Sequence, residues 1–268
     1  MTDNTTIALH FSKADLLRLV NIAHAAGDAI MAIYAQEHIA VTQKSDESPV
    51  TAADLAAHRV IVSQLAEQFA GIAVMSEEAA DIPWDEREQW QTYWLIDPLD
   101  GTKEFIKRNG EFTVNIALIH RGEAIAGVVY APVLNTTYYG AKHLGAWRQD
   151  GQQEQPLQGC KIPRQVPIVV GSRSHLSPDV ADYLNNIGQH EMLSVGSSLK
   201  FCMLAEGKAD LYPRLGPTSE WDTAAAQAVL ESAGGKVVCY DSGLPLTYNQ
   251  KPDILNPYFI ATAPGWAK

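Results

Sequence analysis

Apolar residues recur at helical spacing in two stretches near the start of the chain. Ser12 and Asp15 have the spacing of a capping box, and the apolar residues that follow are three or four positions apart. A second helix is expected over residues 51–69, after a polar loop at residues 44–49. The apolar positions that predict a buried face on the first helix are Leu16, Val20, Ala23, Ala26, Ile30 and Ile33.

Short apolar runs then predict strands. Residues 72–75 form one such run, and residues 93–96 form another that stops abruptly at Asp97-Pro98, as a buried strand does where it meets a loop. A charged connector separates them at residues 83–91. Two further runs flank Arg121-Gly122-Glu123, which predicts a hairpin. The hairpin strands and those expected after them cover residues 112–119, 124–130, 136–140 and 146–148.

A polar, Gln-rich stretch at residues 150–163 separates the hairpins from a region where strands and helices alternate. We therefore predict an N-terminal α+β subdomain over residues 1–150 and a C-terminal α/β subdomain over residues 151–268. Pattern alone indicates a mixed α/β fold with more than one sheet. In the second half, strands are expected at 166–170, 192–195, 209–212 and 236–240, and helices at 178–187, 197–206 and 222–233, the last ended by Gly234-Gly235.

Composition excludes several classes of protein. With 46% apolar and 19% charged residues in 268, the chain is typical of a folded globular protein. A net charge of −11 argues against non-specific binding to nucleic acid or anionic lipid, but not against a small anionic substrate in a cleft with local cations or a metal. The three scattered cysteines do not predict a disulfide framework or a zinc site. Without a signal pattern or an uninterrupted apolar run of ~18 residues, we expect a cytoplasmic protein with no integral membrane segment.

The segment Asp97-Pro-Leu-Asp100-Gly-Thr102 carries the clearest chemical signal. Pro98 favours a turn, which would bring both carboxylates and the Leu99 carbonyl to one point. These hard oxygen ligands suit Mg²⁺. Gly101 permits close approach of a ligand, and Thr102 opens a predicted helix whose N–H groups suit a phosphate. The alternative is a structural Asp cap followed by a proline turn.

Three more carboxylates follow or precede predicted elements. Glu77 comes directly after a strand, and Asp222 and Asp54 each lie in the first turn of a helix. Alone, Glu77 is also typical of a solvated surface acid, Asp222 of an ordinary N-cap, and Asp54 of an acid that interacts with the helix dipole. Together with Asp97 and Asp100, Glu77 and Asp222 supply enough carboxylates for a two-metal site.

These motifs resemble those of the lithium-sensitive, magnesium-dependent phosphatase superfamily, which includes inositol monophosphatases and fructose-1,6-bisphosphatases. The matching segments, in family order, are PVTAAD (49–54), SEE (76–78), DPLDGT (97–102) and EWDTAAAQAVLESAGG (220–235). Residues 93–119, 172–175 and 196–214 are further similar to the bacterial CysQ subfamily of 3′(2′),5′-bisphosphate nucleotidases. The resemblance implies a layered αβαβα sandwich.

The resemblance also implies roles for individual residues. Two or three Mg²⁺ ions would be held by Glu77, Asp97, the Leu99 carbonyl, Asp100 and Asp222. Asp54 and Thr102 would activate the attacking water, with Glu77 counted among the catalytic residues, and Li⁺ would inhibit. The expected substrate contacts are Gly101, Thr102, Ser172, His175, Gly196 and Lys200.

The substrate implied is adenosine 3′,5′-bisphosphate (PAP), cleaved to AMP and phosphate in the service of sulfate assimilation, with PAPS as a further candidate. Its second phosphate needs cations, and Lys103, Lys107, Arg108, Arg173, Lys200 and Arg214 lie in or beside the matching segments. The alternatives are an inositol monophosphatase with the same metal site, a fructose-1,6-bisphosphatase, and a non-catalytic regulatory homologue. Relatives include monomers and homodimers, and CysQ relatives are described as peripheral at the inner membrane. His24 and His58 receive no role.

Overall fold

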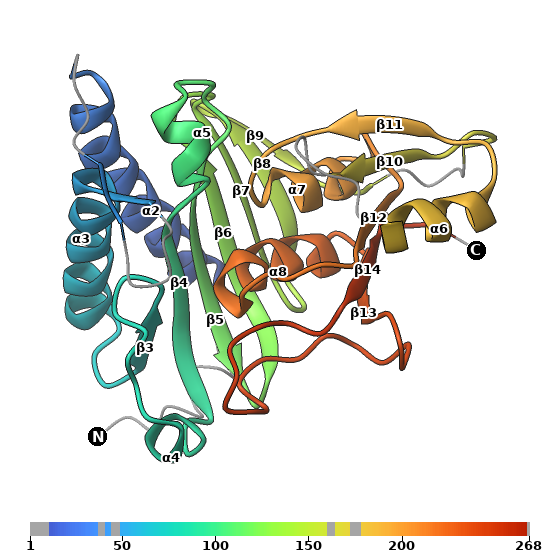
Figure 1. Cartoon of the computed structure of the whole chain (residues 1–268). Helices are drawn as coiled ribbons and strands as arrows, with labels where there is room; N and C mark the ends of the chain where they lie inside the picture. Colours follow the sequence, from blue (N-terminus) through green and yellow to red (C-terminus); the bar gives the residue numbers. More distant parts are fainter. Residues whose placement is uncertain (1–10, 37–40, 44–48, 160–163, 172–177, 267–268) are drawn as a thin grey trace.

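Two β-sheets alternate with three layers of helices (Figure 1). The structure is a computed structural model that describes residues 11–36, 41–43, 49–159, 164–171 and 178–266. Helices α2 (Lys13–Tyr34) and α3 (Ala52–Gln68) cover the outer face of a seven-stranded sheet. Between the two sheets lie α7 (Leu199–Ala205) and α8 (Ala224–Ser232), and α6 (Pro178–Ile187) packs on the far side of the second sheet. The αβαβα sandwich implied by the resemblance is confirmed.

The larger sheet follows the chain in simple order, from β3 to β9. Its first pair, β3 with β4, is parallel, and every later pair is antiparallel. The strands are β3 (Ala73–Ser76), β4 (Thr92–Asp100), β5 (Thr113–His120), β6 (Glu123–Ala131), β7 (Thr136–Ala141), β8 (Gly145–Asp150) and β9 (Gln153–Pro156).

The smaller sheet is mixed and has the order β11-β10-β12-β14-β13. Strand β10 is parallel to both of its neighbours, and β14 is antiparallel to both of its own. The strands are β10 (Ile168–Gly171), β11 (Glu191–Ser194), β12 (Leu211–Arg214), β13 (Lys236–Cys239) and β14 (Phe259–Thr262). The remaining elements are the strand pair β1 (Val41–Gln43) and β2 (Pro49–Thr51), the short helices α4 (Trp84–Arg87) and α5 (Thr102–Ile106), and the 3₁₀ turn η1 (Glu220–Asp222).

Most of the predicted elements are present. The capping box of Ser12 and Asp15 forms at the start of α2, the hairpin of β5 and β6 forms around Arg121 and Gly122, and α6 has its predicted bounds. The chain leaves α8 at Gly234, whose φ of 96° is the left-handed conformation that ends helices.

Several predicted boundaries were wrong. The connector at 83–91 contains α4, the polar stretch at 150–163 contains β9, and the helix predicted over 222–233 is split into η1 and α8. Strand β14 was not predicted. The loop predicted at 44–49 falls outside the described residues except for Pro49, which belongs to β2. The first sheet ends at Pro156 and the second begins at Ile168, while the division into two subdomains stays a prediction.

Burial on both faces explains why the central strands are almost continuously apolar. Tyr93 and Leu95 of β4 join the core between the sheets, whereas Trp94 and Ile96 join the core under α2 and α3. A sheet covered on both sides has no polar face to alternate with the apolar one. The abrupt change at Asp97 therefore marks where the strand leaves the two cores and meets the site.

Helix α2 has an 18-residue stretch of mean hydropathy 1.4, so by length and composition alone it is a candidate to cross a membrane. Buried core helices meet the same criterion. One face of α2, including Leu19, Ala23 and Ile30, is buried in the core that it shares with α3 and the first sheet.

Helix α8 lies unusually close to the first sheet at Gly127 of β6. A Cβ atom on Gly127 would lie 2.2 Å from the Ala225 carbonyl oxygen and 2.9 Å from the Ala225 Cα. Backbone atoms of a packed helix cannot move aside as a flexible side chain can. Only glycine fits here, and the fit sets the distance between α8 and the sheet.

We expect Gly127→Ala to lower the free energy of unfolding by about 1–3 kcal/mol, the usual cost of overpacking a core. Urea denaturation would measure the change. Gly216→Ala is the matched control, because a Cβ at Gly216 meets no atom within 4 Å. Equal stability of the two variants would contradict the close contact between α8 and β6.

Candidate active site

A β-bulge places Asp97 and Asp100 on the same side of β4. Asp97 pairs with Asn115 and Asp100 with Thr113, so two residues of β4 lie opposite one residue of β5. In a regular strand, positions three apart point to opposite faces. The extra residue reverses this: Leu99 packs in the core under α2 and α3, and both carboxylates face the space between the sheets. The sequence had predicted a turn at Pro98, and the structure has an irregular strand that continues to Asp100.

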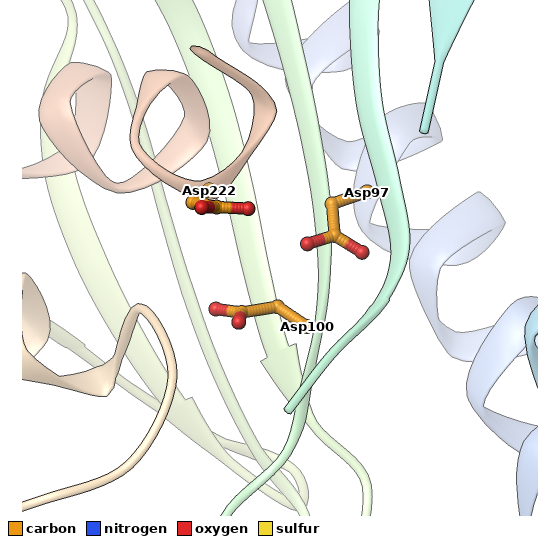
Figure 2. Close-up of side chains that lie close together, drawn as sticks. All are labelled: Asp97, Asp100 and Asp222. Carbon is orange, nitrogen blue, oxygen red and sulfur yellow. The ribbon is translucent and has the colours of Figure 1, made fainter. Parts of the chain in front are cut away.

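Asp222 completes a cluster of three carboxylates (Figure 2). One oxygen from each of Asp97, Asp100 and Asp222 lies within 4.8 Å of the others. The first two come from the end of β4, and Asp222 comes from η1, just before α8. Residues more than a hundred positions apart in the chain therefore meet at one point.

Glu77 lies beside this cluster. Strand β3 is parallel to β4 with Ser76 opposite Ile96, and the Glu77 N–H donates to the Ile96 carbonyl at 3.2 Å. This register puts Glu77 next to Asp97, and its charge helps to raise the pKa of the Asp97 carboxyl. The structure thus brings together the four predicted carboxylates, although their role as metal ligands stays a prediction.

Asp54 and Thr102 form the predicted pair. The Thr102 hydroxyl donates to Asp54 Oδ1 at 3.1 Å and also lies 3.4 Å from the Leu99 carbonyl oxygen. The second oxygen of Asp54 accepts from the Thr51 N–H at 2.8 Å and from its hydroxyl, so a capping box holds the carboxylate in place. Asp54 is therefore both a structural cap and a partner of Thr102.

Groups from the second half of the chain hold two of the clustered carboxylates. Asp100 Oδ2 accepts the Ser198 N–H at 2.6 Å, and Asp222 Oδ2 accepts the Thr218 hydroxyl at 2.7 Å and the Ser219 N–H at 2.9 Å. Neither Ser198 nor Thr218 was predicted. The Ser219–Asp222 spacing of a capping box was a readable signal, whereas the contact from Ser198 was not, because it joins residues about a hundred positions apart.

Burial and mutual repulsion disfavour the charged forms of these acids. Burial, followed by the charges of Glu77, Asp100 and Asp222, raises the pKa of Asp97 well above its usual range. Burial and Asp222 raise the pKa of Asp100 to about 7, despite the opposing effect of Lys200. Burial also raises the pKa of Asp222, although the hydrogen bonds from Thr218 and Ser219 oppose the shift. Clustered carboxylates with raised pKa values are typical of a cation site.

The donor set fits a hard divalent cation. Carboxylate oxygens within 4.8 Å of one another are ligands that Mg²⁺ takes, and the Leu99 carbonyl belongs to the segment between Asp97 and Asp100. A bound cation would remove the repulsion that raises the pKa values. Without a metal, the acids would have to retain protons or repel one another.

A cavity of about 330 Å³ opens beside the cluster. That volume is within the usual range for small-molecule sites. Acidic and basic side chains share its wall, and the charges of Arg214 and Lys200 oppose the rise in the pKa of Asp222. The charged residues of the wall are Asp100, Glu104, Asp222, Lys103, Lys200 and Arg214, and Gly101, Gly196, Ser197, Phe201 and Tyr212 also line it.

The predicted substrate residues differ in where they lie. Gly101, Gly196 and Lys200 line the cavity, and Thr102 adjoins Gly101, while Ser172 and His175 fall outside the described residues. Of the six cations proposed for a second phosphate, Lys103, Lys200 and Arg214 line the cavity.

The other three predicted cations are not among the described residues that line the cavity. Arg108 is exposed and donates to the carbonyls of Tyr34 and Gln36 at the end of α2, so its observed contact is structural. Lys107 is exposed outside the lining, and Arg173 lies beyond the described residues.

Gly101 and Lys200 each have a structural function that the sequence did not reveal. Gly101 has φ of 97°, and a Cβ there would lie 3.1 Å from the Glu111 carbonyl oxygen, so the backbone conformation requires glycine before any ligand is considered. Lys200 is buried, and its ammonium donates to the carbonyls of Ser197 at 2.7 Å and Val195 at 3.3 Å. Lys200 thus fixes the loop that forms the cavity wall.

Comparison with known proteins points to one family. The model of the inositol monophosphatase family matches residues 13–267. The chain is 49% identical over 256 residues to the 3′(2′),5′-bisphosphate nucleotidase CysQ of Salmonella typhimurium, with 92% of this chain and 99% of the relative covered. It is also 49% identical to CysQ of Escherichia coli K12 over 251 residues, 90% of this chain and 97% of the relative.

Solved structures agree with these sequence matches. The crystal structure of CysQ from Bacteroides thetaiotaomicron superimposes with a TM-score of 0.84 at 39% identity and covers 97% of this chain and 100% of its own. The inositol monophosphatase from Anabaena superimposes with a TM-score of 0.74 at 26% identity, with 94% of this chain and 92% of the other covered.

The raised pKa of Asp100 predicts how the metal-free protein responds to pH. A carboxyl whose pKa is about 7 in the fold and 3.8 in the unfolded chain favours folding when protonated. In the presence of a chelator, we expect the free energy of unfolding to fall as pH rises from about 4 through about 7. Asp100→Asn should reduce that fall, and denaturation curves at several pH values would measure it. Identical pH dependence in both proteins would contradict the assigned shift.

Proposed function

The chain belongs to the inositol monophosphatase family, and we propose that it is a metal-dependent 3′(2′),5′-bisphosphate nucleotidase that hydrolyses the 3′-phosphate of PAP to AMP and phosphate. The observation that carries this proposal is the position of the Asp97–Asp100–Asp222 cluster at the edge of a cavity that is also lined by basic side chains. The acids suit the metal ions that a phosphatase needs, and the basic side chains suit a second phosphate. Identity of about half the residues to proteins named CysQ supports this choice of substrate.

Metal dependence is general in the family, and Mg²⁺ is the ion that we propose. The ligands would be Glu77, Asp97, the Leu99 carbonyl, Asp100 and Asp222, holding two or three ions with Li⁺ as an inhibitor. When bound, Mg²⁺ supplies positive charge that activates a water and stabilises the leaving oxygen in phosphate ester hydrolysis.

Protein groups would orient the attacking water and hold the phosphate. Because the Thr102 hydroxyl donates its hydrogen bond to Asp54, its lone pairs remain available to accept a hydrogen bond from a water molecule and so orient it. The backbone N–H groups of Gly101 and Thr102 would then hold the departing phosphate. Glu77, which lies next to Asp97, would help to hold the attacking water in place beside Thr102.

The second phosphate distinguishes PAP from inositol phosphate. Lys103 and Arg214 bring positive charge to the cavity wall, and Lys200 adds to it from a buried position. Phe201 and Tyr212 are almost wholly buried in the core between the sheets, so they support this wall without offering an open surface to a base. Gly196 would contact the nucleotide from the same wall, as would Ser172 and His175, which lie outside the described residues. PAPS, which also carries a 3′-phosphate, is a further substrate within this proposal.

An inositol monophosphatase remains the second candidate, because the same acids serve both activities. The structural neighbour from Anabaena has that name, at lower identity than the CysQ relatives. The complete set of predicted acids disfavours a non-catalytic regulatory homologue. With the nucleotidase function we also propose a cytoplasmic location and a role in sulfate assimilation. The chain would act as a monomer or a homodimer. Nothing among the described residues supports association with the membrane surface.

Phosphate release from PAP and from inositol 1-phosphate, measured in parallel with and without Mg²⁺, tests the proposal. We expect PAP to be strongly preferred and turnover to require Mg²⁺. Asp97→Asn should lower turnover by several orders of magnitude with the thermal melting temperature retained, because it removes a charged ligand from the cluster. Asp241→Asn, an exposed carboxylate outside the cluster, is the control. An active Asp97→Asn enzyme would refute the metal assignment, and a preference for inositol 1-phosphate would refute the substrate.

Arg214 allows a test of the second-phosphate contact alone. Arg214→Met should raise KM for PAP by about 10-fold or more, the usual effect of losing a hydrogen bond to a charged group. The KM for 3′-AMP, which lacks the second phosphate, should change far less. Lys107→Met, an exposed cation outside the cavity lining, should leave both values unchanged. Equal effects of Arg214→Met on both substrates would show that Arg214 does not recognise the second phosphate.

A further inference from the structure

His58 joins helix α3 to the end of the strand that carries Glu77. His58 Nδ1 lies 2.8 Å from the Ser76 hydroxyl oxygen, and the Ser76 side chain is buried. Ser76 is the last residue of β3 and directly precedes Glu77. The hydrogen bond therefore fixes the chain one residue before a carboxylate of the proposed metal site.

The same face of α3 holds the other side of the site. Asp54 and His58 are one helical turn apart and so point in similar directions. Asp54 binds Thr102, which follows the Asp97–Asp100 segment, while His58 binds Ser76. One helix face is thus bonded to two of the three segments that bring acids to the site.

Ser76 makes two hydrogen bonds with its hydroxyl group. Its oxygen accepts the Glu78 N–H at 3.3 Å, and its proton is donated to His58 Nδ1 when that nitrogen carries no proton. Burial lowers the pKa of His58, which favours the neutral imidazole that can accept this proton. Two hydrogen bonds therefore connect His58 of α3, through the Ser76 hydroxyl, to the backbone N–H of Glu78 on the other side of Glu77.

We propose that His58 is a positioning residue that acts through Ser76 to hold Glu77 in the metal site. The register of β3 and β4 puts Glu77 beside Asp97. The bond between His58 and Ser76 fixes the residue directly before Glu77 and so keeps its carboxylate ready to bind a cation. This inference rests on the proposed metal-dependent function, but it concerns metal affinity and not the choice of substrate.

The test measures Mg²⁺ binding directly. Isothermal titration of the metal-free protein with Mg²⁺ alone should show a weaker affinity for His58→Ala, by about 10-fold or more, as for other residues that orient metal ligands. The Mg²⁺ concentration for half-maximal PAP hydrolysis should rise in parallel, with kcat at saturating Mg²⁺ within about 3-fold of wild type. His58→Asn, whose Oδ1 can take the place of Nδ1, should restore most of the affinity.

Ser76→Ala removes the same bond from the other side and keeps the test open if His58→Ala does not fold. The double variant should bind Mg²⁺ no more weakly than Ser76→Ala alone, because all three variants lose the bond between His58 and Ser76, while Ser76→Ala also loses the bond from the Glu78 N–H. The control is His24→Ala. His24 is also partly buried and lies 2.7 Å from a threonine hydroxyl, that of Thr137, on strand β7 away from the cluster.

The outcomes separate this inference from the proposed function. Unchanged Mg²⁺ affinity in His58→Ala and Ser76→Ala, or an equal loss in His24→Ala, would overturn the positioning role. A wild-type protein that binds Mg²⁺, with the predicted loss in the variants, but does not hydrolyse PAP would support the positioning role and overturn only the proposed substrate. Failure of the wild type to bind Mg²⁺ would overturn both.

Discussion

The structure of the site depends on holding like charges together. Two carboxylates about 5 Å apart repel each other by roughly 3 kcal/mol at an effective dielectric constant of 20, and three such groups meet here. The fold opposes this repulsion with fixed donors: Ser198 for Asp100, and Thr218 and Ser219 for Asp222. The acids are consequently placed for a cation before one arrives, and part of the folding free energy is converted into metal affinity.

Local signals in the sequence accounted for the parts of the site that depend on neighbouring residues. Asp97 and Asp100 converge within one short segment, as predicted. The capping box of Thr51 and Asp54 joins positions three apart, a local spacing that was not used in the prediction. The sequence did not predict the β-bulge that brings Asp97 and Asp100 together. A turn at Pro98, which was predicted instead, would place the two side chains in a similar way. The contacts of Ser198 with Asp100 and of His58 with Ser76 join distant segments, and no local pattern reveals them.

The fold shows the same division between local and distant information. Strand β9 was missed because its four residues are exposed and polar, so it has no apolar period to detect. Strand β14 has a readable apolar run, but its central position between β12 and β13 depends on long-range pairing. The layer order likewise came from resemblance to a family, because the pattern indicated only a mixed fold.

The chain as a whole is negatively charged, whereas the cavity beside the site is lined by several basic side chains. The chain carries a net charge of −11, yet Lys103, Lys200 and Arg214 line one cavity next to the acids. A nucleotide with two phosphates therefore meets acids suited to metal and basic side chains within one cavity. Attraction at such short range operates largely within the cavity, because salt screens the rest of the surface over about 10 Å.

The close fit of α8 against Gly127 has a consequence for synthesis on the ribosome. The inner face of the first sheet is complete once β9 has emerged, but α8, which covers it at Gly127, begins about 70 residues later. At 5–20 residues per second, that interval lasts roughly 3–14 s. During this time the nascent chain exposes an apolar sheet and lacks Asp222. The emerging polypeptide thus passes through a period in which it is most exposed to chaperones and proteases and has no complete set of acids with which to act on nucleotides.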